Sequence, residues 1–571
     1  MATGDQPMQP GPLRGRPSSA AGEQIAPGGG EDEIVTRKPD RIEAWSRSLL
    51  MHLLWVGAAA IALALQFLRG FDGLYLSQAM DFAQIARHLA AGHGYVTSFL
   101  RPVAIPLYPY APAPEIYHAP LYPLILGFVF GALPQTDAVV AGVSAFFFAA
   151  TVVMIYVLAS RVFDRSVGVL AAVVFALNGQ ALAYAVSGLH VMMWAFLLAL
   201  SLYLLHANQG SVSRGIAAGA VLGLAWLTDY MTFALVIPML LAAYYGRSAA
   251  CEQGASRLRH PQAAHRLAWF ALGLIVVAIP WCVRNSIVAG DPFFTLERYT
   301  LAMFTGAHPG YTLFRSADAS ALNLVSLIAS APLSLIKKGM LGLASAYRTL
   351  PPLVGLYVIG FLVVALMRPL GAPRRNLVRN ASILLLVFLA VIGAFFNPTA
   401  ELFFVIAPPI TVLCGGYFVM LLRGWIKTPG RQALAYAVFV VVAAYPTLVS
   451  WVTPQPKVAV NRVNLDFLAH TLPRNAIVVT DAPWAVAWYA DRTAVWLPLE
   501  PEDFEAVQKR IGMDAVYFSS LLATYPPSER AQLWQHIFAA RAAPPGFAAE
   551  ALPQPGEVLL VKRGEPQRRA P

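Results

Sequence analysis

An acidic and a basic side chain share one face of a helix predicted in the segment 75–95. Apolar residues recur at helical spacing between positions 82 and 89, and Gly92 and Gly94 end the pattern. Asp81 and His88 are seven residues apart, which is two helical turns, so both side chains lie on one face. Two interpretations stay open: Asp81 is an acid aimed at a reaction site, or it satisfies free N–H groups near the helix start.

The composition indicates that this helix belongs to a membrane protein. Of 571 residues, 57% are hydrophobic and 12% are charged, and the mean hydropathy is +0.58. A soluble protein carries roughly a quarter charged residues. The net charge of +11 could suggest nucleic acid. However, the basic residues form short clusters between apolar runs, as in cytoplasmic loops, so we expect no nucleic-acid binding.

About eleven apolar runs are long enough to be candidate spans, since crossing a bilayer takes about 20 mostly apolar residues. The runs are 49–69, 138–160, 166–184, 189–206, 214–229, 231–245, 266–283, 350–367, 379–396, 403–421 and 433–452. The segment 120–133 is short, and we interpret it as a juxtamembrane or re-entrant helix. The basic clusters then predict a multi-pass protein of the inner (plasma) membrane, with a cytoplasmic N-terminus and an extracytoplasmic C-terminus.

The fold class expected is therefore mainly α: a transmembrane helical bundle with a small extracytoplasmic α/β domain. Residues 1–48 are predicted to be a disordered cytoplasmic tail, because they are rich in Gly, Pro, Ser and charge. Residues 49–452 form the membrane domain, with outer loops at 70–137 and 284–349. In the C-terminal domain, 453–571, the pattern predicts strands at 476–480, 494–497, 515–519 and 558–562, and helices at 503–511 and 528–540.

Four segments together resemble the GT-C membrane glycosyltransferases. The similarity is to the dolichyl-phosphate-mannose protein mannosyltransferase superfamily, including its bacterial lipid A aminoarabinose transferase-like relatives. The segments that carry it are 75–95 with His118–Pro123, Leu222–Thr228, Ile279–Asn285 with Gly290–Phe293, and Ala482–Arg492. They span most of residues 50–500.

The resemblance implies a GT-C-like fold and an inverting transfer of one sugar. The donor would be a polyprenyl-phosphate-linked sugar in the lipid bilayer, and the acceptor a lipid, glycan or protein of the cell envelope. An acid in the first outer loop would take the proton of the acceptor hydroxyl. The leaving group is already a phosphate, so positive charge is needed to hold it.

The candidate acids depart from the family pattern. Many members carry an Asp-Glu pair at the start of the first-loop helix, where this sequence has Gln78 and Ala79. Asp81 lies one turn later and is the predicted catalytic base, with Asp72 in reserve. A second acid would be Asp229, at the outer end of a span where an ionisable residue is costly, or Glu115.

Further ionisable residues complete the predicted site. Basic residues of the second outer loop are predicted to bind the carrier phosphate: Arg284, Arg298, Arg315, Lys337 and Lys338. Contact with anionic lipid headgroups is the alternative for Lys337 and Lys338, and snorkelling for Arg284. Substrate-positioning candidates are His88, His93, Arg101, Glu115 and His118. We predict no certain cofactor, although His88, His93, His118 and Asp81 could bind a divalent metal.

Two other functions stay open. The chain could be a transporter or flippase of lipid-linked saccharides, which should show internal repeats and broken or charged helices at mid-membrane. It could also be a non-catalytic scaffold of envelope assembly, since the Asp-Glu pair is missing. No clear repeat is visible and the spans carry few charges. The sequence therefore favours the glycosyltransferase.

Overall fold

The computed structural model describes residues 41–563 except for 209–210, 246–260, 356–357, 371–372, 454–459 and most of 526–545. Residues 1–50 form one unit of the chain and residues 51–571 a second, which holds the elements discussed below. Positions 1–40 of the predicted tail lie outside the described residues, as does nearly all of the helix predicted at 528–540. Residues 41–48 are helical, so the tail ends earlier than predicted.

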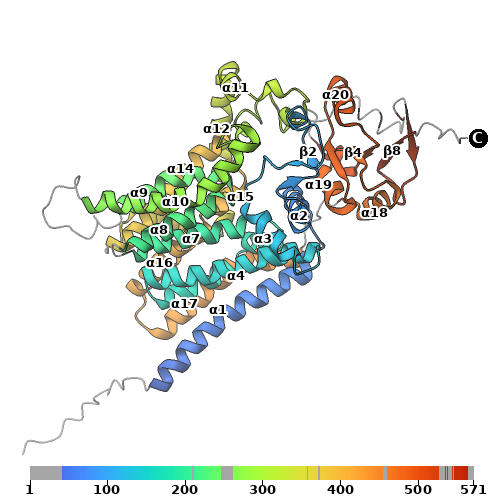
Figure 1. Ribbon diagram of the computed structural model, residues 1–571. Helices are drawn as coiled ribbons and strands as arrows, with labels where there is room; N and C mark the ends of the chain where they lie inside the picture. The colour runs from blue at the N-terminus through green and yellow to red at the C-terminus, as the bar shows by residue number, and fades with distance from the viewer. Residues whose placement is uncertain are drawn as a thin grey trace, which may run out of the picture. The chain divides into compact units, whose positions relative to one another are not determined.

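The described residues are mostly helical (Figure 1). The helices up to the second outer loop are α1 Arg41–Gly70, α2 Ser77–Ala90, α3 Leu121–Phe130, α4 Asp137–Val162, α5 Arg165–Ala176, α6 Gly179–Ala185, α7 Val191–Ala207, α8 Val212–Trp226, α9 Phe233–Tyr245 and α10 Pro261–Ala289. The later ones are α11 Leu324–Ser330, α12 Pro332–Val354, α13 Ile359–Met367, α14 Pro373–Phe395, α15 Ala400–Phe404, α16 Ala407–Trp425, α17 Pro429–Val452, α18 Arg462–Thr471, α19 Pro483–Ala485 and α20 Pro501–Ile511.

Every predicted span falls on one or more of these helices. By length and composition, five described helices can cross a membrane, or up to seven if each of two bent pairs is one span. Five further apolar helices have 10–17 residues, among them α3, which is too short to span alone. One bent pair is α5 with α6, where the axis turns by 65°. Asn178 lies at this bend, and its side chain accepts a hydrogen bond from the Ala181 N–H at the start of α6.

The boundary predicted between the second outer loop and the following span is wrong. We expected a loop up to residue 349 and a helix over 350–367. Instead α12 begins at Pro332, and the helix breaks after Val354 at Gly355, whose φ of 93° favours glycine. Pro332 at the first helical position and the 89° turn from α11 explain the early start.

Glycines allow α8 and α10 to pack with their backbones in close approach. A Cβ atom on Gly219 would lie 1.8 Å from the Phe270 carbonyl oxygen, and one on Gly273 would lie 2.1 Å from the Ile216 carbonyl oxygen. In lipid the hydrophobic effect does not drive helices together, and small residues at a crossing instead allow close van der Waals packing between them. The packing of α8 against α10 fixes the end of α8, which lies just before residue 229.

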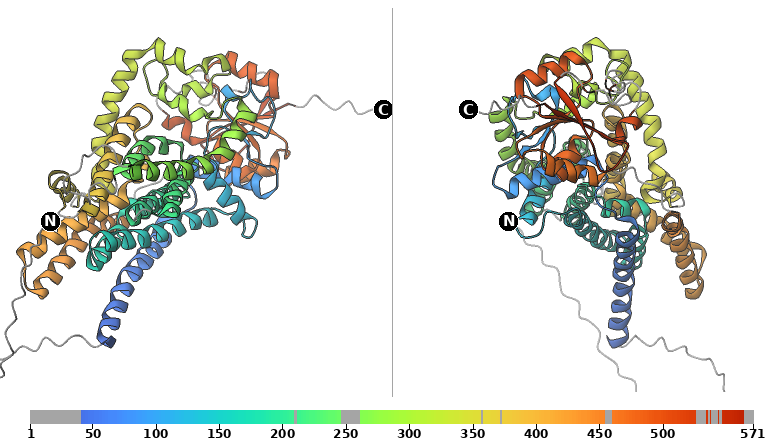
Figure 2. Two further views of the ribbon diagram at one scale, coloured as in Figure 1. Left: turned by 60° about the vertical axis from the view of Figure 1, so that its left-hand side comes forward. Right: turned by 90° about the vertical axis from the view of Figure 1, so that its right-hand side faces the viewer.

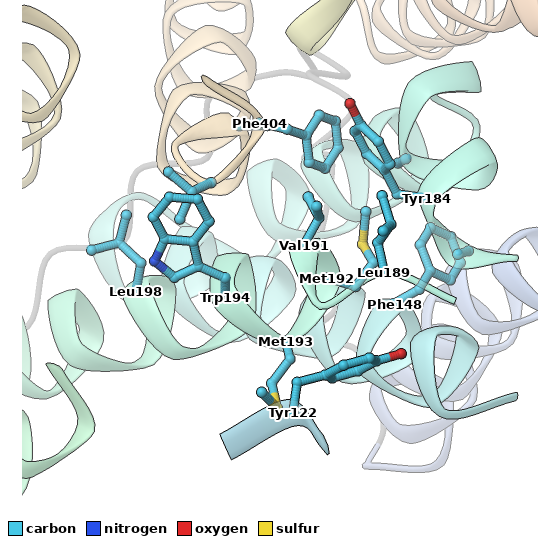
Figure 3. Packing of buried hydrophobic residues seen from close by; sticks show 14 of the residues in the cluster. Tyr122, Phe148, Tyr184, Leu189, Val191, Met192, Met193, Trp194, Leu198 and Phe404 are labelled. Carbon is cyan, nitrogen blue, oxygen red and sulfur yellow. The ribbon is translucent and has the colours of Figure 1, made fainter. Parts of the chain in front are cut away.

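Helix α7 runs through the centre of the hydrophobic core. Four consecutive residues from Val191 to Trp194 are each buried, so the helix is covered all round. Figure 3 shows Phe148, Tyr122 and Phe404 from other segments packed around them. The N-terminal end of α7 is thereby fixed inside the molecule.

The C-terminal region contains one mixed sheet. Its six strands lie in the order β2-β5-β4-β6-β8-β7. They are β2 Phe99–Leu100, β4 Ile477–Thr480, β5 Thr493–Trp496, β6 Ala515–Phe518, β7 Phe547–Glu550 and β8 Val558–Lys562, and a second sheet pairs β1 Val96–Thr97 with β3 Ala113–Pro114. Strands β2, β5, β4 and β6 run parallel to one another. Strand β8 pairs antiparallel with both β6 and β7. Strands lie at all four predicted positions, and α20 lies at the predicted helix.

This sheet crosses the predicted domain boundary at residue 453. Strand β2 comes from the first outer loop and pairs with β5, Leu100 lying opposite Val495. Both views of Figure 2 show this part of the first loop beside the C-terminal sheet. The first loop and the C-terminal region therefore share one framework.

Candidate active site

A cavity of about 480 Å³ lies where the first outer loop, the ends of several helices and the C-terminal sheet meet. Its wall includes α2, the start of α7, and the 3-10 turns η2 Tyr230–Thr232 and η4 Leu296–Leu301. Four carboxylic acids line it: Asp81, Asp229, Glu297 and Glu401. Arg101, His118 and His190 are the basic side chains in the same wall.

Asp81 is buried in this wall by three side-chain partners. Its Oδ1 accepts a hydrogen bond from Gln84 Nε2 at 2.8 Å. Its Oδ2 lies 3.1 Å from Arg101 Nη2 and 2.8 Å from His118 Nε2. The Asp81 side chain is 4% exposed, and those of Arg101 and His118 are 6% exposed. Since charges are rarely buried without a partner, the two basic side chains account for this carboxylate.

The rings around Arg101 and His118 hold both in place. The Arg101 guanidinium lies 4.2 Å from the ring centres of Phe99 and Tyr117. Phe82 packs against the His118 ring at 4.7 Å. Cation–π contacts of this kind fix the plane of an arginine side chain.

Electrostatics favour the ionised form of Asp81. Burial raises the pKa of this carboxyl, but the His118 ring, Arg101 and the Gln84 hydrogen bond lower it and outweigh burial. The pKa of Asp81 is therefore below its usual value, and the group is a carboxylate at neutral pH. A carboxylate has more lone pairs than its three partners use, so it can still accept a proton or a hydrogen bond.

A second carboxylate–histidine pair lies in the same cavity. His190 Nε2 is 2.8 Å from Asp229 Oδ2, and Asp229 Oδ1 accepts from the Met231 N–H. Phe82 lies between the two pairs, since its ring also packs against His190 at 5.2 Å. Glu297 is the neighbour of this pair: burial raises its pKa well above the usual value, and Asp229 raises it further.

The remaining first-loop candidates lie outside the cavity. His88 faces the segment after α2, as its shared face with Asp81 predicts, but it contacts Ser98 and His93 in a separate outer pocket. Burial and the His93 ring lower the pKa of His88 to about 4. Asp72 is exposed and lines a third pocket.

Glu115 shapes the loop and does not line the cavity. This fully buried carboxylate accepts hydrogen bonds from the backbone N–H groups of Tyr117, at 2.6 Å, and His118, at 2.9 Å. It therefore holds the turn that presents the His118 ring to Asp81. Contact of Glu115 with substrate stays a prediction.

The structure does not gather the predicted phosphate-binding residues into the cavity wall. Arg284 donates to the Glu115 carbonyl oxygen at 2.7 Å, and Arg298 pairs with Asp291 at 2.6 Å. Arg315 is buried and donates to the Leu497 carbonyl oxygen. Each guanidinium has a partner within the chain, and none of the three lines the cavity, so phosphate binding by these residues stays a prediction.

The two lysines differ from each other. Lys338 is buried, and its Nζ donates to the carbonyl oxygens of Thr300 and Leu301. It therefore holds η4, the turn that carries Glu297. Lys337 is exposed on α12.

The four-residue metal site considered from the sequence is not assembled. His88 and His93 line one pocket, whereas Asp81 and His118 line another. In the part of the chain that the structure describes, no three His, Cys, Asp or Glu side chains are arranged to hold a metal ion.

Several lining residues were missed by the sequence analysis. His190 was not among the predicted site residues, although it lines the cavity. Glu401 lies between two apolar runs, and an isolated acid in such a place could have been recognised as functional. Glu297 and Trp496 carry no local signal, because segments distant in the sequence bring them to the cavity.

The comparisons with known proteins agree with this fold. Residues 117–281 match the model of the dolichyl-phosphate-mannose-protein mannosyltransferase family, a stretch that contains His118, His190 and Asp229. No curated protein sequence matches the chain.

Solved structures with the same fold include those of two glycosyltransferases. ArnT from Cupriavidus metallidurans bound to undecaprenyl phosphate is 13% identical, with a TM-score of 0.53 over 90% of this chain and 98% of that one. The oligosaccharyltransferase AglB from Archaeoglobus fulgidus, with an inhibitory peptide and a dolichol-phosphate, is 15% identical, with a TM-score of 0.52 over 84% of this chain and 70% of that one. The resemblance is therefore confirmed for the fold: the chain has the fold of the GT-C membrane glycosyltransferases, and its residues 117–281 match the dolichyl-phosphate-mannose-protein mannosyltransferase family model.

Proposed function

We propose that this protein transfers a sugar from a polyprenyl-phosphate carrier to an extracytoplasmic acceptor of the cell envelope, with inversion at the anomeric carbon. The acceptor is a lipid, a glycan or a protein. Two similar structures support the carrier, because ArnT is bound to undecaprenyl phosphate and AglB to a dolichol-phosphate. The cavity, the first loop and the C-terminal sheet then lie on the outer side of the inner membrane, opposite the basic clusters.

The observation that carries this proposal is the buried Asp81 carboxylate beside Arg101 and His118 in the cavity wall. In a single displacement, the acceptor oxygen bonds to the anomeric carbon as the bond to the carrier phosphate breaks. The hydroxyl proton passes to Asp81 Oδ1 or Oδ2, and His118 stabilises the orientation of that carboxylate.

The carrier phosphate leaves as an anion and needs a cation. Arg101 is the only arginine or lysine lining the cavity among the residues that the structure describes. A guanidinium has five N–H donors, and its hydrogen bond to Asp81 uses one of them. We therefore assign the phosphate to Arg101 in place of Arg284, Arg298 and Arg315.

Sugar transfer by purified variants tests the proposal. Protein in lipid nanodiscs is given labelled polyprenyl-phosphate sugars and a cell-envelope extract. We expect Asp81→Asn to reduce transfer by about 10²–10⁴-fold, the usual cost of losing a general base. Asp72→Asn is the matched control, because this exposed acid of the same loop lies outside the cavity.

Equal transfer by wild type and Asp81→Asn would move the base to another acid, with Asp229 first. If wild type folds, binds polyprenyl phosphate and transfers no sugar from any donor, the chain is a transporter or a scaffold instead. Size-exclusion chromatography of each variant shows whether it folds.

A further inference from the structure

The C-terminal sheet directs the carboxyl ends of its parallel strands at the cavity. Arg101 follows β2, Trp496 ends β5 and Trp484 comes shortly after β4, and all three line the cavity. Tyr525 follows β6 after the turn η8 Ser520–Thr524 and lines it too. In open sheets with parallel strands, ligands bind beyond the carboxyl ends of the strands. The C-terminal region is thus part of the site and does not merely cover it.

The aromatic side chains at this edge form a continuous wall. The rings of Trp484 and Trp496 are 6.1 Å apart and nearly perpendicular. Phe99 contacts Trp496 at 5.6 Å and Trp484 at 6.3 Å. Since Arg101 lies on the Phe99 ring, the wall continues directly to the guanidinium that binds Asp81.

One polar atom in this wall has no partner. Trp496 is 7% exposed, and its Nε1 donates to no acceptor in the described residues. Other indoles do donate to protein acceptors, namely Trp194, Trp281, Trp451, Trp488 and Trp534. Buried polar groups are satisfied in the great majority of cases, so the orphan indole N–H calls for an acceptor that the chain itself does not supply.

We propose that Trp484, Trp496 and Tyr525 form a subsite for an uncharged sugar ring, which we call the tryptophan subsite. A pyranose has C–H faces that pack on aromatic rings and a rim of hydroxyls that accept hydrogen bonds. The wall supplies the aromatic surface for those faces. We assign one of the hydroxyls to the buried Trp496 indole N–H, which has no acceptor among the described residues. Two arginines adjoin the wall: Arg101 lies on the Phe99 ring, and the Arg315 guanidinium lies 6.0 Å from the centre of the Tyr525 ring. The aromatic rings of the wall are themselves uncharged, which suits an uncharged sugar ring.

The sugar has two sources, and this inference rests on the proposed transfer reaction. The ring belongs either to the polyprenyl-phosphate donor or to the acceptor. Both pass close to Asp81 and Arg101, the residues adjoining the wall. The shared chemistry is a neutral pyranose.

Binding measurements separate the two sources. Native mass spectrometry of the full chain in nanodiscs gives its preference for polyprenyl-phosphate hexoses (glucose, mannose and N-acetylglucosamine forms) over bare polyprenyl phosphate. Trp496→Phe removes the N–H and keeps an aromatic ring, and Trp484→Leu removes a ring. If the donor sugar occupies the subsite, each variant lowers that preference by about three- to tenfold, the range expected for one hydrogen bond in Trp496→Phe and for one aromatic contact in Trp484→Leu. Affinity for bare polyprenyl phosphate should not change, and Trp425→Phe, on an 85% exposed residue of α16, should change neither.

If the acceptor sugar occupies the subsite, the donor preference is unchanged and the variants raise the KM for a saccharide acceptor by the same factor. Variants that change neither quantity overturn the tryptophan subsite while leaving the transfer reaction intact. Failure of the proposed function looks different, because wild type would then bind the carrier without transferring any sugar.

Discussion

Two carboxylate–histidine pairs occupy one cavity, and they differ in their third neighbour. Asp81 and His118 are 2.8 Å apart, as are Asp229 and His190, and Phe82 packs on both histidines. Arg101 completes the first pair, whereas Glu297 adjoins the second. The first carboxylate is therefore stabilised as an anion, while the acid next to the second pair is driven toward its protonated form.

The difference shows that residue type and pairwise distance do not define a role. A carboxylate beside a guanidinium lies where a negatively charged phosphate and a proton acceptor are needed together. A carboxylate beside another acid shares a site that tolerates only limited negative charge. We therefore expect the first pair to carry the chemistry and the second to bind or orient neutral parts of a substrate.

Among changes to the neighbours of the two carboxylates, removing the cation of the first pair should have the largest effect. We expect Arg101→Gln to reduce transfer by about 10²–10³-fold, as when one donor to a developing anion is lost. Because Arg101 lowers the pKa of Asp81, its loss raises that pKa, and the acidic limb of the pH–rate profile should move to higher pH. Transfer assays across pH measure both. Arg298→Gln is the control, since this arginine pairs with Asp291 outside the cavity, and equal losses in both variants would contradict the assignment.

Replacing each histidine by glutamine compares the two carboxylate–histidine pairs directly. His118→Gln should reduce kcat by about 10–100-fold, because the hydrogen bond it weakens is made to the charged base. His190→Gln should reduce kcat less and act mainly on KM. Steady-state kinetics of both variants decide between these outcomes. A larger loss of kcat in His190→Gln would transfer the catalytic role to Asp229.

Neutralising Glu297 should have the smallest effect. Burial and Asp229 raise its pKa well above the usual value, which favours the protonated form, and an amide differs little from a protonated acid. We expect Glu297→Gln to keep transfer within about threefold of wild type at neutral pH.

The pH dependence of stability sharpens this last prediction. An acid whose pKa is higher in the folded than in the unfolded protein stabilises the fold while it is protonated. This stabilisation is complete below the pKa of the unfolded state and is lost as the pH rises through the pKa of the folded state. The Tm of wild type should therefore fall more steeply on alkalisation than that of Glu297→Gln. Parallel Tm curves for the two proteins would show that Glu297 is ionised at neutral pH.

The sequence predicted much of what depends on local pattern. Helical spacing located α2 with Asp81 on it, apolar runs located the helices of the bundle, and alternation located four strands of the C-terminal sheet. These predictions succeeded because the spacing of hydrophobic residues within a segment depends on which face of that segment is buried. The break after Val354 was missed, since apolar composition continues across it.

The partners of the charged residues could not be predicted. Arg284 donates to the Glu115 carbonyl oxygen, 169 positions away in the chain, a contact that its expected role in binding phosphate did not indicate. Arg315 donates to Leu497, 182 positions away. A charged side chain in a sequence shows only what it can bind, and its partner depends on which distant segment folds against it.

By itself, the sequence determined a helical membrane protein with an acid on an outer-loop helix and a resemblance to one transferase fold. The tertiary structure decided which charges meet: Asp81 with Arg101 and His118, and Asp229 with His190. It also decided that β2 of the first loop joins the C-terminal sheet, which brings Trp484 and Trp496 to the same cavity. The physical reason is that periodicity is encoded within one segment, whereas a site is made by long-range packing between several.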